Sequence, residues 1–211
     1  MSRLVLLDIG GVLIRIRTWD RALRAGGLSA ARCSTLLPRL GELETLWLEF
    51  EGGACGWEVF QAQLFERFGL APAESETCAY AILDQAFPGT AELVNDLRRA
   101  GLKLGTLSNT NPFHWAHMAS GAGPFRLPFD GFEFPFTSFQ LGELKPGPEI
   151  YAAAESLSGH QPASIAFFDD RAENVRAALE RGWCAGRIDP ESSRPPAQQI
   201  RAQLRRWSWI P

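Results

Sequence analysis

The sequence lacks any long apolar run. No stretch of its 211 residues approaches the roughly 20 consecutive apolar residues that a membrane-spanning helix needs. The apolar run near the amino terminus is interrupted at Asp8, which makes it too short for the apolar region of a secretion signal. We therefore expect a cytoplasmic protein with no membrane partner.

Cysteine is scarce and widely spaced. Cys33, Cys55, Cys78 and Cys184 form neither the close pairs of a zinc site nor the dense pattern of a disulfide-rich domain. We interpret them as reduced thiols that pack as small apolar side chains.

Excess charge of one sign is also absent. The 24 acidic and 21 basic residues give a net charge of −3, which provides no general attraction to nucleic acid. Basic and aromatic residues alternate only near the carboxyl terminus. A terminal helix that packs its apolar side on the core, with solvated arginines, accounts for them better than nucleic-acid binding. They are Arg201, Arg205, Arg206, Trp207 and Trp209.

Lysine is rare, because only two of the 21 cationic residues are lysines. Lys103 begins a predicted strand and is expected to be a solvated charge. Lys145 lies in a loop just before Pro146. A compact ammonium suits a point contact that a planar guanidinium would not fit, so the use of lysine here indicates a function for Lys145.

Three apolar segments end in polar side chains. Leu4–Leu7 leads into Asp8, residues 102–107 lead into Ser108 and Asn109, and residues 164–168 lead into Asp169 and Asp170. Apolar runs of this length are typical of strands in a parallel sheet, which bind ligands at their carboxyl edge. We expect these polar groups to meet at that edge, although each alone is equally typical of a turn or a helix cap.

The other segments predict an α/β fold. Residues 18–87 show helical periodicity without a strand signal, and residues 13–17 could form a short ribbon before them. Further on we expect helices at 91–101, 148–157 and 172–181 and strands at 132–136 and 183–188, with Pro135 favouring an edge strand. This alternation indicates a Rossmann-like parallel sheet as the core, at 1–17 and 88–211, with a small α-helical cap inserted at 18–87.

An acid, a hydroxyl, a lysine and an acid pair in this order resemble the four motifs of the haloacid dehalogenase (HAD) superfamily, over nearly the whole chain. The resemblance implies that Asp8 is a nucleophile that forms an aspartyl-phosphate. It implies that Ser108 and the backbone amide of Asn109 bind phosphate oxygens beside the Gly10-Gly11 turn, and that Lys145 neutralises the phosphate. Mg²⁺ would be held by Asp8, the backbone carbonyl of Gly10, Asp169 and Asp170.

Within the superfamily, the motif strings are most similar to phosphatases with a small helical cap, such as the bacterial α-D-glucose-1-phosphate phosphatases. One position departs from most superfamily phosphatases, which carry an acid-base aspartate where this chain has Gly10. His114 and His117 are candidate substitutes, although buried or surface histidines without that role are commoner. A glycine at position 10 also suggests a positive φ that would strain an aspartate. Asn174 either orients the acid pair or lies exposed on a helix.

Three functions follow from these motifs. The leading one is a Mg²⁺-dependent phosphatase of a small phosphorylated metabolite, such as a sugar 1-phosphate, acting as a monomer or homodimer. The second is a 2-haloacid dehalogenase, which uses the same nucleophile without a metal; the Asp169-Asp170 pair argues against it. The third is a phosphate-binding protein with weak catalysis, which only Gly10 favours.

Overall fold

Five parallel strands form the central sheet, in the spatial order β5-β4-β1-β6-β7. The computed structural model describes residues 2–120, 125, 127 and 129–211. The strand with Pro135 lies at the edge of the sheet, as expected. Proline has no backbone N–H to donate, and an edge strand has an open side on which no such bond is needed. The strands are β1 (Leu4–Leu7), β4 (Lys103–Ser108), β5 (Phe134–Thr137), β6 (Ile165–Asp169) and β7 (Cys184–Arg187).

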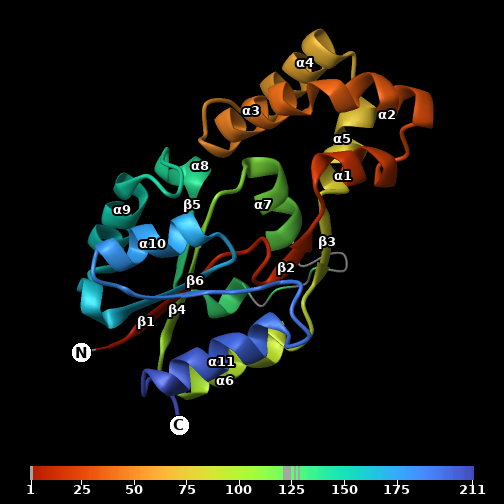
Figure 1. Ribbon diagram of the computed structural model, residues 1–211. Coiled ribbons are helices and arrows are strands. Elements are labelled where there is room, and N and C mark those ends of the chain that lie inside the picture. Colours follow the sequence, from red (N-terminus) through yellow and green to blue (C-terminus); the bar gives the residue numbers. More distant parts are fainter. Residues whose placement is uncertain (1, 121–124, 126, 128) are drawn as a thin grey trace.

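Alternating side chains of β1 enter two separate apolar layers. Leu4 and Leu6 pack with residues of α9 (Pro148–Ser158) and α10 (Ala172–Glu180) on one face of the sheet. Val5 and Leu7 pack with residues of α6 (Thr90–Arg99) and α11 (Pro196–Arg206) on the other face. Because successive side chains of a strand point to opposite faces, the sheet is covered by helices on both sides. The result is the three-layer α/β fold in Figure 1, which confirms the predicted fold class.

Five further helices lie together beyond the sheet (Figure 1). They have their own apolar core, to which Phe113 of α7 (Pro112–Ala119) also contributes. The division into a core and a cap with boundaries near residues 18 and 87 stays a prediction. The five helices are α1 (Trp19–Ala25), α2 (Ala30–Leu36), α3 (Leu40–Glu51), α4 (Trp57–Phe68) and α5 (Pro72–Tyr80).

A two-stranded antiparallel ribbon joins these helices to the sheet. Strand β2 (Ile14–Ile16) was expected as a short ribbon, and its partner is β3 (Leu83–Ala86). The expectation that residues 18–87 contain no strand is therefore wrong at β3. Only Leu83 is buried in this four-residue strand, so no apolar alternation marks it, and it depends on pairing with a segment about 70 residues earlier.

The carboxyl-terminal segment packs as expected. Helix α11 buries Ile200 and Leu204 in the same apolar layer as Trp209, while Arg205 and Arg206 are exposed. The guanidinium of Arg3 lies 5.0 Å from the centre of the Trp209 ring, which ties the tail to the start of β1. The aromatic residues of the tail thus pack on the apolar core.

Shorter helices complete the fold: α8 (Ser138–Leu141), and the 3₁₀ turns at Leu37–Arg39, Phe129–Gly131 and Pro162–Ser164. All four cysteines are free. No helix in the described part of the chain has both the length and the apolar character needed to cross a membrane.

Candidate active site

The site lies at the carboxyl edge of the sheet, where β1 ends between β4 and β6. Leu7 pairs with Thr106 on one side and with Phe168 on the other. The register therefore brings Asp8 level with Asp169, which ends β6, and next to the loop after Ser108, which ends β4. The Asp8 N–H continues the ladder by donating to the Phe168 carbonyl at 2.9 Å. Such a position between oppositely directed crossovers is where open α/β sheets form binding crevices.

Lys145 is buried between two of the predicted acids. Its Nζ lies 3.1 Å from Oδ1 of Asp8 and 2.6 Å from Oδ2 of Asp169, and it also donates to the Leu107 carbonyl at 2.8 Å. Burial lowers the pKa of Lys145, but the charges of Asp169 and Asp8 outweigh it, so the pKa is raised and the ammonium stays charged. Three acceptors match the three N–H donors of this side chain, which is only 1% exposed.

The side chain of Asn109 holds the loop that carries Lys145. Its Nδ2 donates to the Lys145 carbonyl at 3.0 Å, and its Oδ1 accepts the Lys145 N–H at 2.9 Å. The sequence had suggested only a backbone role for Asn109. This side-chain role could not be found from the sequence, because the two residues are 36 positions apart and meet only through the fold.

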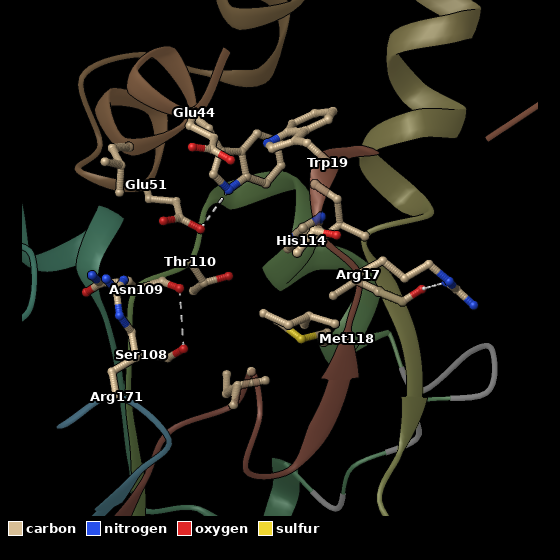
Figure 2. Close-up of a pocket in the computed structure, with 18 residues that line it drawn as sticks. Arg17, Trp19, Glu44, Glu51, Ser108, Asn109, Thr110, His114, Met118 and Arg171 are labelled. Carbon is tan, nitrogen blue, oxygen red and sulfur yellow. Dashed lines mark hydrogen bonds between the residues drawn. The ribbon is translucent and has the colours of Figure 1, made fainter. Parts of the chain in front are cut away.

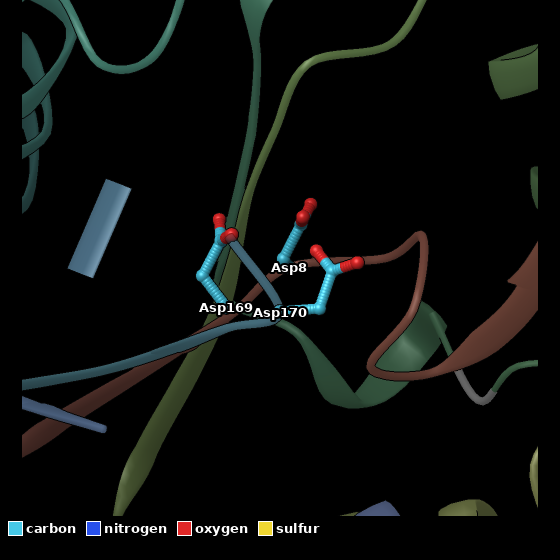
Figure 3. Close-up of side chains that lie close together, drawn as sticks. All are labelled: Asp8, Asp169 and Asp170. Carbon is cyan, nitrogen blue, oxygen red and sulfur yellow. The ribbon is translucent and has the colours of Figure 1, made fainter. Parts of the chain in front are cut away.

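Three carboxylates lie together at this edge of the sheet (Figure 3). Asp8, Asp169 and Asp170 can each offer one oxygen such that all three atoms lie within 4.8 Å of one another. Burial raises the pKa of Asp8 to about 7, while Lys145 opposes this shift; burial and Asp169 also raise the pKa of Asp170. Acids that repel one another in a buried site favour a bound cation, and clustered carboxylate oxygens are ligands that Mg²⁺ prefers.

The two acids of the pair have different surroundings. Asp169 is fully buried, and its oxygens accept bonds from the Arg171 N–H at 2.8 Å, from the Asn174 amide at 3.0 Å and from Lys145. The Asp170 side chain is partly exposed and lies against Gly11. Asn174 is buried and oriented toward the acid pair, so it is not an exposed helix residue. Asp8 and Asp170 are therefore the acids with oxygens left for a cation.

The Gly10-Gly11 turn is constrained at its second residue. Gly11 has a φ of +72°, and a Cβ there would come within 2.5 Å of Oδ2 of Asp170. Gly10 does not have a positive φ, and a Cβ there would meet only the flexible end of Ile16, at 3.1 Å. The expected positive φ at Gly10 is therefore wrong, because Gly11 makes the sharp turn.

A cavity of about 460 Å³ lies between this sheet edge and the helices α1 and α3 (Figure 2). Gly10, Ser108 and Asn109 line it on the sheet side. The sequence had not indicated the residues on the other side, because a tryptophan or glutamate at helical spacing is typical of any core or surface. That wall includes Trp19, Glu44, Trp47 and Glu51, with Arg17 and Arg171 at the flanks.

Neither histidine past Ser108 fits the role of proton donor. His114 lines the cavity, but its ring Nε2 is bonded to the Ala79 carbonyl at 2.8 Å, and burial lowers its pKa to about 4. It is therefore neutral at pH 7. His117 bonds through Nδ1 to the Phe113 carbonyl at 2.8 Å and faces a different cavity, beside Tyr80.

Comparison with known proteins agrees with this geometry. Residues 3–182 match the haloacid dehalogenase-like hydrolase family. The chain is 30% identical over 194 residues to the D-ribitol-5-phosphate phosphatase of Bacteroides thetaiotaomicron, covering 87% of this chain and 90% of that protein. It is 25% identical over 208 residues to the (S)-2-haloacid dehalogenase of Xanthobacter autotrophicus, covering 95% and 80%.

A similar fold occurs in the crystal structure of a HAD family enzyme from Bacteroides thetaiotaomicron in complex with magnesium and inorganic phosphate. The TM-score is 0.78 with 23% sequence identity, and the match covers 92% of this chain and 97% of that chain.

Replacement of each lysine by methionine tests the buried ammonium. Lys145→Met leaves buried carboxylates without their counter-charge, and we expect it to lower the free energy of unfolding by about 3 kcal/mol in metal-free buffer. Lys103→Met removes only a pair with Glu133 in which the lysine is 43% exposed, and should cost less than about 1 kcal/mol. Urea denaturation followed by circular dichroism measures both; equal losses would contradict the assignment.

The two glycines of the turn provide a second test. We expect Gly11→Ala to displace Asp170 and to lower the affinity for Mg²⁺ at least tenfold, because the backbone is strained and the Cβ collides with the carboxylate. Gly10→Ala should leave the affinity within about threefold, since only Ile16 must move. Calorimetric titration of each folded variant with Mg²⁺ decides this, and a weaker affinity in Gly10→Ala than in Gly11→Ala would be the opposite result.

Proposed function

Because this chain belongs to the haloacid dehalogenase-like hydrolases, we propose that it is a Mg²⁺-dependent phosphatase of a small phosphorylated metabolite. The observation that carries the proposal is the set of three clustered carboxylates with a buried lysine between two of them. A dianionic phosphate cannot approach such a cluster unless a cation neutralises it. Asp8, Asp170, the Gly10 carbonyl and, more weakly, Asp169 would hold Mg²⁺, which supplies that neutralisation when bound.

The residues of the chain divide the reaction between them. Asp8 attacks phosphorus in line with the ester oxygen, the ester bond breaks, and an aspartyl-phosphate forms that water later hydrolyses. Ser108 and the Asn109 backbone N–H donate hydrogen bonds to phosphate oxygens. Lys145, held by the Asn109 side chain, places its positive charge where negative charge develops in the transition state.

A 2-haloacid dehalogenase is the second candidate, because its nucleophile is also an aspartate and the Xanthobacter dehalogenase is a relative. A haloacid substrate carries its own carboxylate, and its dehalogenation needs no metal. The clustered Asp8, Asp169 and Asp170 would repel such a substrate, so the electrostatics favour the phosphatase.

The cavity wall favours a sugar or polyol phosphate, such as a sugar 1-phosphate. The carboxylate of Glu44 can accept hydrogen bonds from hydroxyl groups. The buried indole N–H of Trp19 has no hydrogen-bond partner among the described residues, so it is available to a hydroxyl oxygen. The likeness to a D-ribitol-5-phosphate phosphatase supports the same class of substrate.

Asp8→Asn tests the nucleophile. We expect hydrolysis of p-nitrophenyl phosphate to require Mg²⁺, to stop in EDTA and to fall about a thousandfold or more in Asp8→Asn. Asp130→Asn, an exposed aspartate outside the site, is the control. Full activity in Asp8→Asn would reject the nucleophile, and dechlorination of 2-chloropropionate in EDTA would favour the dehalogenase. Phosphate binding without turnover would favour a binding protein.

Trp19→Phe tests the substrate class, because it removes the indole N–H and keeps an aromatic ring. We expect KM for a preferred pentitol or hexose phosphate to rise about tenfold, the loss of one hydrogen bond to a buried donor. Hydrolysis of acetyl phosphate, which does not reach this wall, should change less than twofold. Equal losses on both substrates would show that Trp19 acts through the fold alone.

A further inference from the structure

Among the described residues, neither position 10 nor the two histidines past Ser108 supplies a proton to a leaving oxygen. Gly10 has no side chain, His114 is neutral, and His117 faces another cavity. An alkoxide expelled from a sugar phosphate is a strong base, and general acid help for such a group is worth about a hundred- to ten-thousandfold in rate. A phosphatase built on this site therefore needs a donor from elsewhere in the cavity wall.

Glu51 is fixed in position relative to the phosphate-binding loop. It is the last residue of α3, and its carbonyl lies 2.6 Å from the hydroxyl of Ser138. That same hydroxyl accepts the N–H of Thr110 at 2.9 Å. Because Thr110 directly follows Ser108 and Asn109, one buried serine joins the end of α3 to the loop that binds phosphate.

The carboxyl group of Glu51 has one oxygen held and one oxygen available. Trp47 Nε1 donates to Oε1 at 2.8 Å, and no other described residue forms a side-chain hydrogen bond with this carboxyl group. Figure 2 shows the side chain extending from α3 into the cavity, toward Thr110. The free oxygen can therefore reach a ligand.

Glu51 can carry a proton at neutral pH. Burial raises its pKa to about 7, although the Trp47 hydrogen bond and the charges of Lys145 and Arg171 lower it. A carboxyl group with a pKa in this range exchanges its proton near neutral pH, which suits both donation and acceptance of a proton. The other ionisable groups that line the same cavity are Arg17, Glu44, His114 and Arg171.

We propose that Glu51, at the end of helix α3, is the general acid and base that replaces the missing aspartate at position 10. As the Asp8 oxygen bonds to phosphorus and the ester bond breaks, the Glu51 carboxyl gives its proton to the departing oxygen and becomes a carboxylate. It then takes a proton from the water that attacks the aspartyl-phosphate, which restores the Glu51 acid, free Asp8 and inorganic phosphate. The proposal rests on the phosphatase function proposed above.

In-line displacement supports this assignment. The leaving oxygen must lie across phosphorus from the attacking Asp8 oxygen, so it points away from the sheet edge. Helix α3, with Glu44 and Glu51, lies across the cavity from Ser108 (Figure 2). The departing group therefore faces the helix that carries Glu51.

Glu51→Gln tests the proposal, with Glu49→Gln on the exposed side of the same helix as the control. The amide can still accept the Trp47 hydrogen bond, so the fold is preserved, but it cannot give up a proton at neutral pH. We expect kcat/KM for an alkyl phosphate, which reports the step that expels the leaving group, to fall at least a hundredfold. We expect kcat/KM for p-nitrophenyl phosphate, whose leaving group needs no proton, to fall less than fivefold. Glu49→Gln should change neither.

The wild-type protein provides a second readout that needs no variant. The ratio of kcat/KM for the alkyl phosphate to kcat/KM for the aryl phosphate should fall as the pH rises above about 7, approaching tenfold for each pH unit, as Glu51 loses its proton. Both substrates use Asp8, so its ionisation cancels in the ratio. In Glu51→Gln the ratio should be low and independent of pH.

The outcomes separate this proposal from the function on which it rests. A wild-type protein that forms no phosphoenzyme from p-nitrophenyl phosphate with Mg²⁺ would overturn the phosphatase and the role of Glu51 together. If the wild-type protein does form the phosphoenzyme, two results would overturn only the role of Glu51. One is an alkyl-to-aryl ratio that does not vary with pH, and the other is a ratio that is unchanged in Glu51→Gln.

Discussion

The contact on which the site depends is the buried ammonium of Lys145 between Asp8 and Asp169. Two carboxylates taken out of water repel each other, and only a charge of opposite sign at hydrogen-bond distance makes their burial tolerable. The protein satisfies every donor of that lysine, and clamps its backbone through the Asn109 side chain. Asp170, outside this pairing, keeps its carboxylate for a cation.

The sheet makes this arrangement rigid. Asp8, Ser108 and Asp169 end three adjacent strands whose register is set by hydrogen bonds, so the distances between them cannot change without breaking the sheet. The helices beyond the ribbon β2–β3 contribute the opposite wall, with a tryptophan donor and two glutamates. In the function that we propose, charge neutralisation is concentrated at the sheet, and recognition of the rest of a substrate at the helices. Proton transfer, in our proposal, is also supplied from the helices.

Much of the site could be predicted from the sequence, because its residues directly follow apolar strands. Asp8, Ser108 and the Asp169-Asp170 pair are marked by the runs that precede them, and Lys145 by the rarity of lysine. The family membership that these motifs implied is confirmed. Strand β3 and the side-chain role of Asn109 could not be predicted, since both depend on partners far away in the chain.

The sequence by itself determined the alternation of strands and helices and the chemical groups at the strand ends. Apolar residues repeat every two positions in a strand and every 3.6 in a helix, and this spacing and the residue that follows a strand are both local properties. Only the tertiary structure decided which groups meet. It placed the positive φ at Gly11 and not at Gly10, and left His114 neutral. It also turned Glu51, which reads in the sequence as an ordinary helix-end charge, toward the cavity. Burial and proximity set the pKa and the available partners of such a side chain, and both arise only when distant segments pack together.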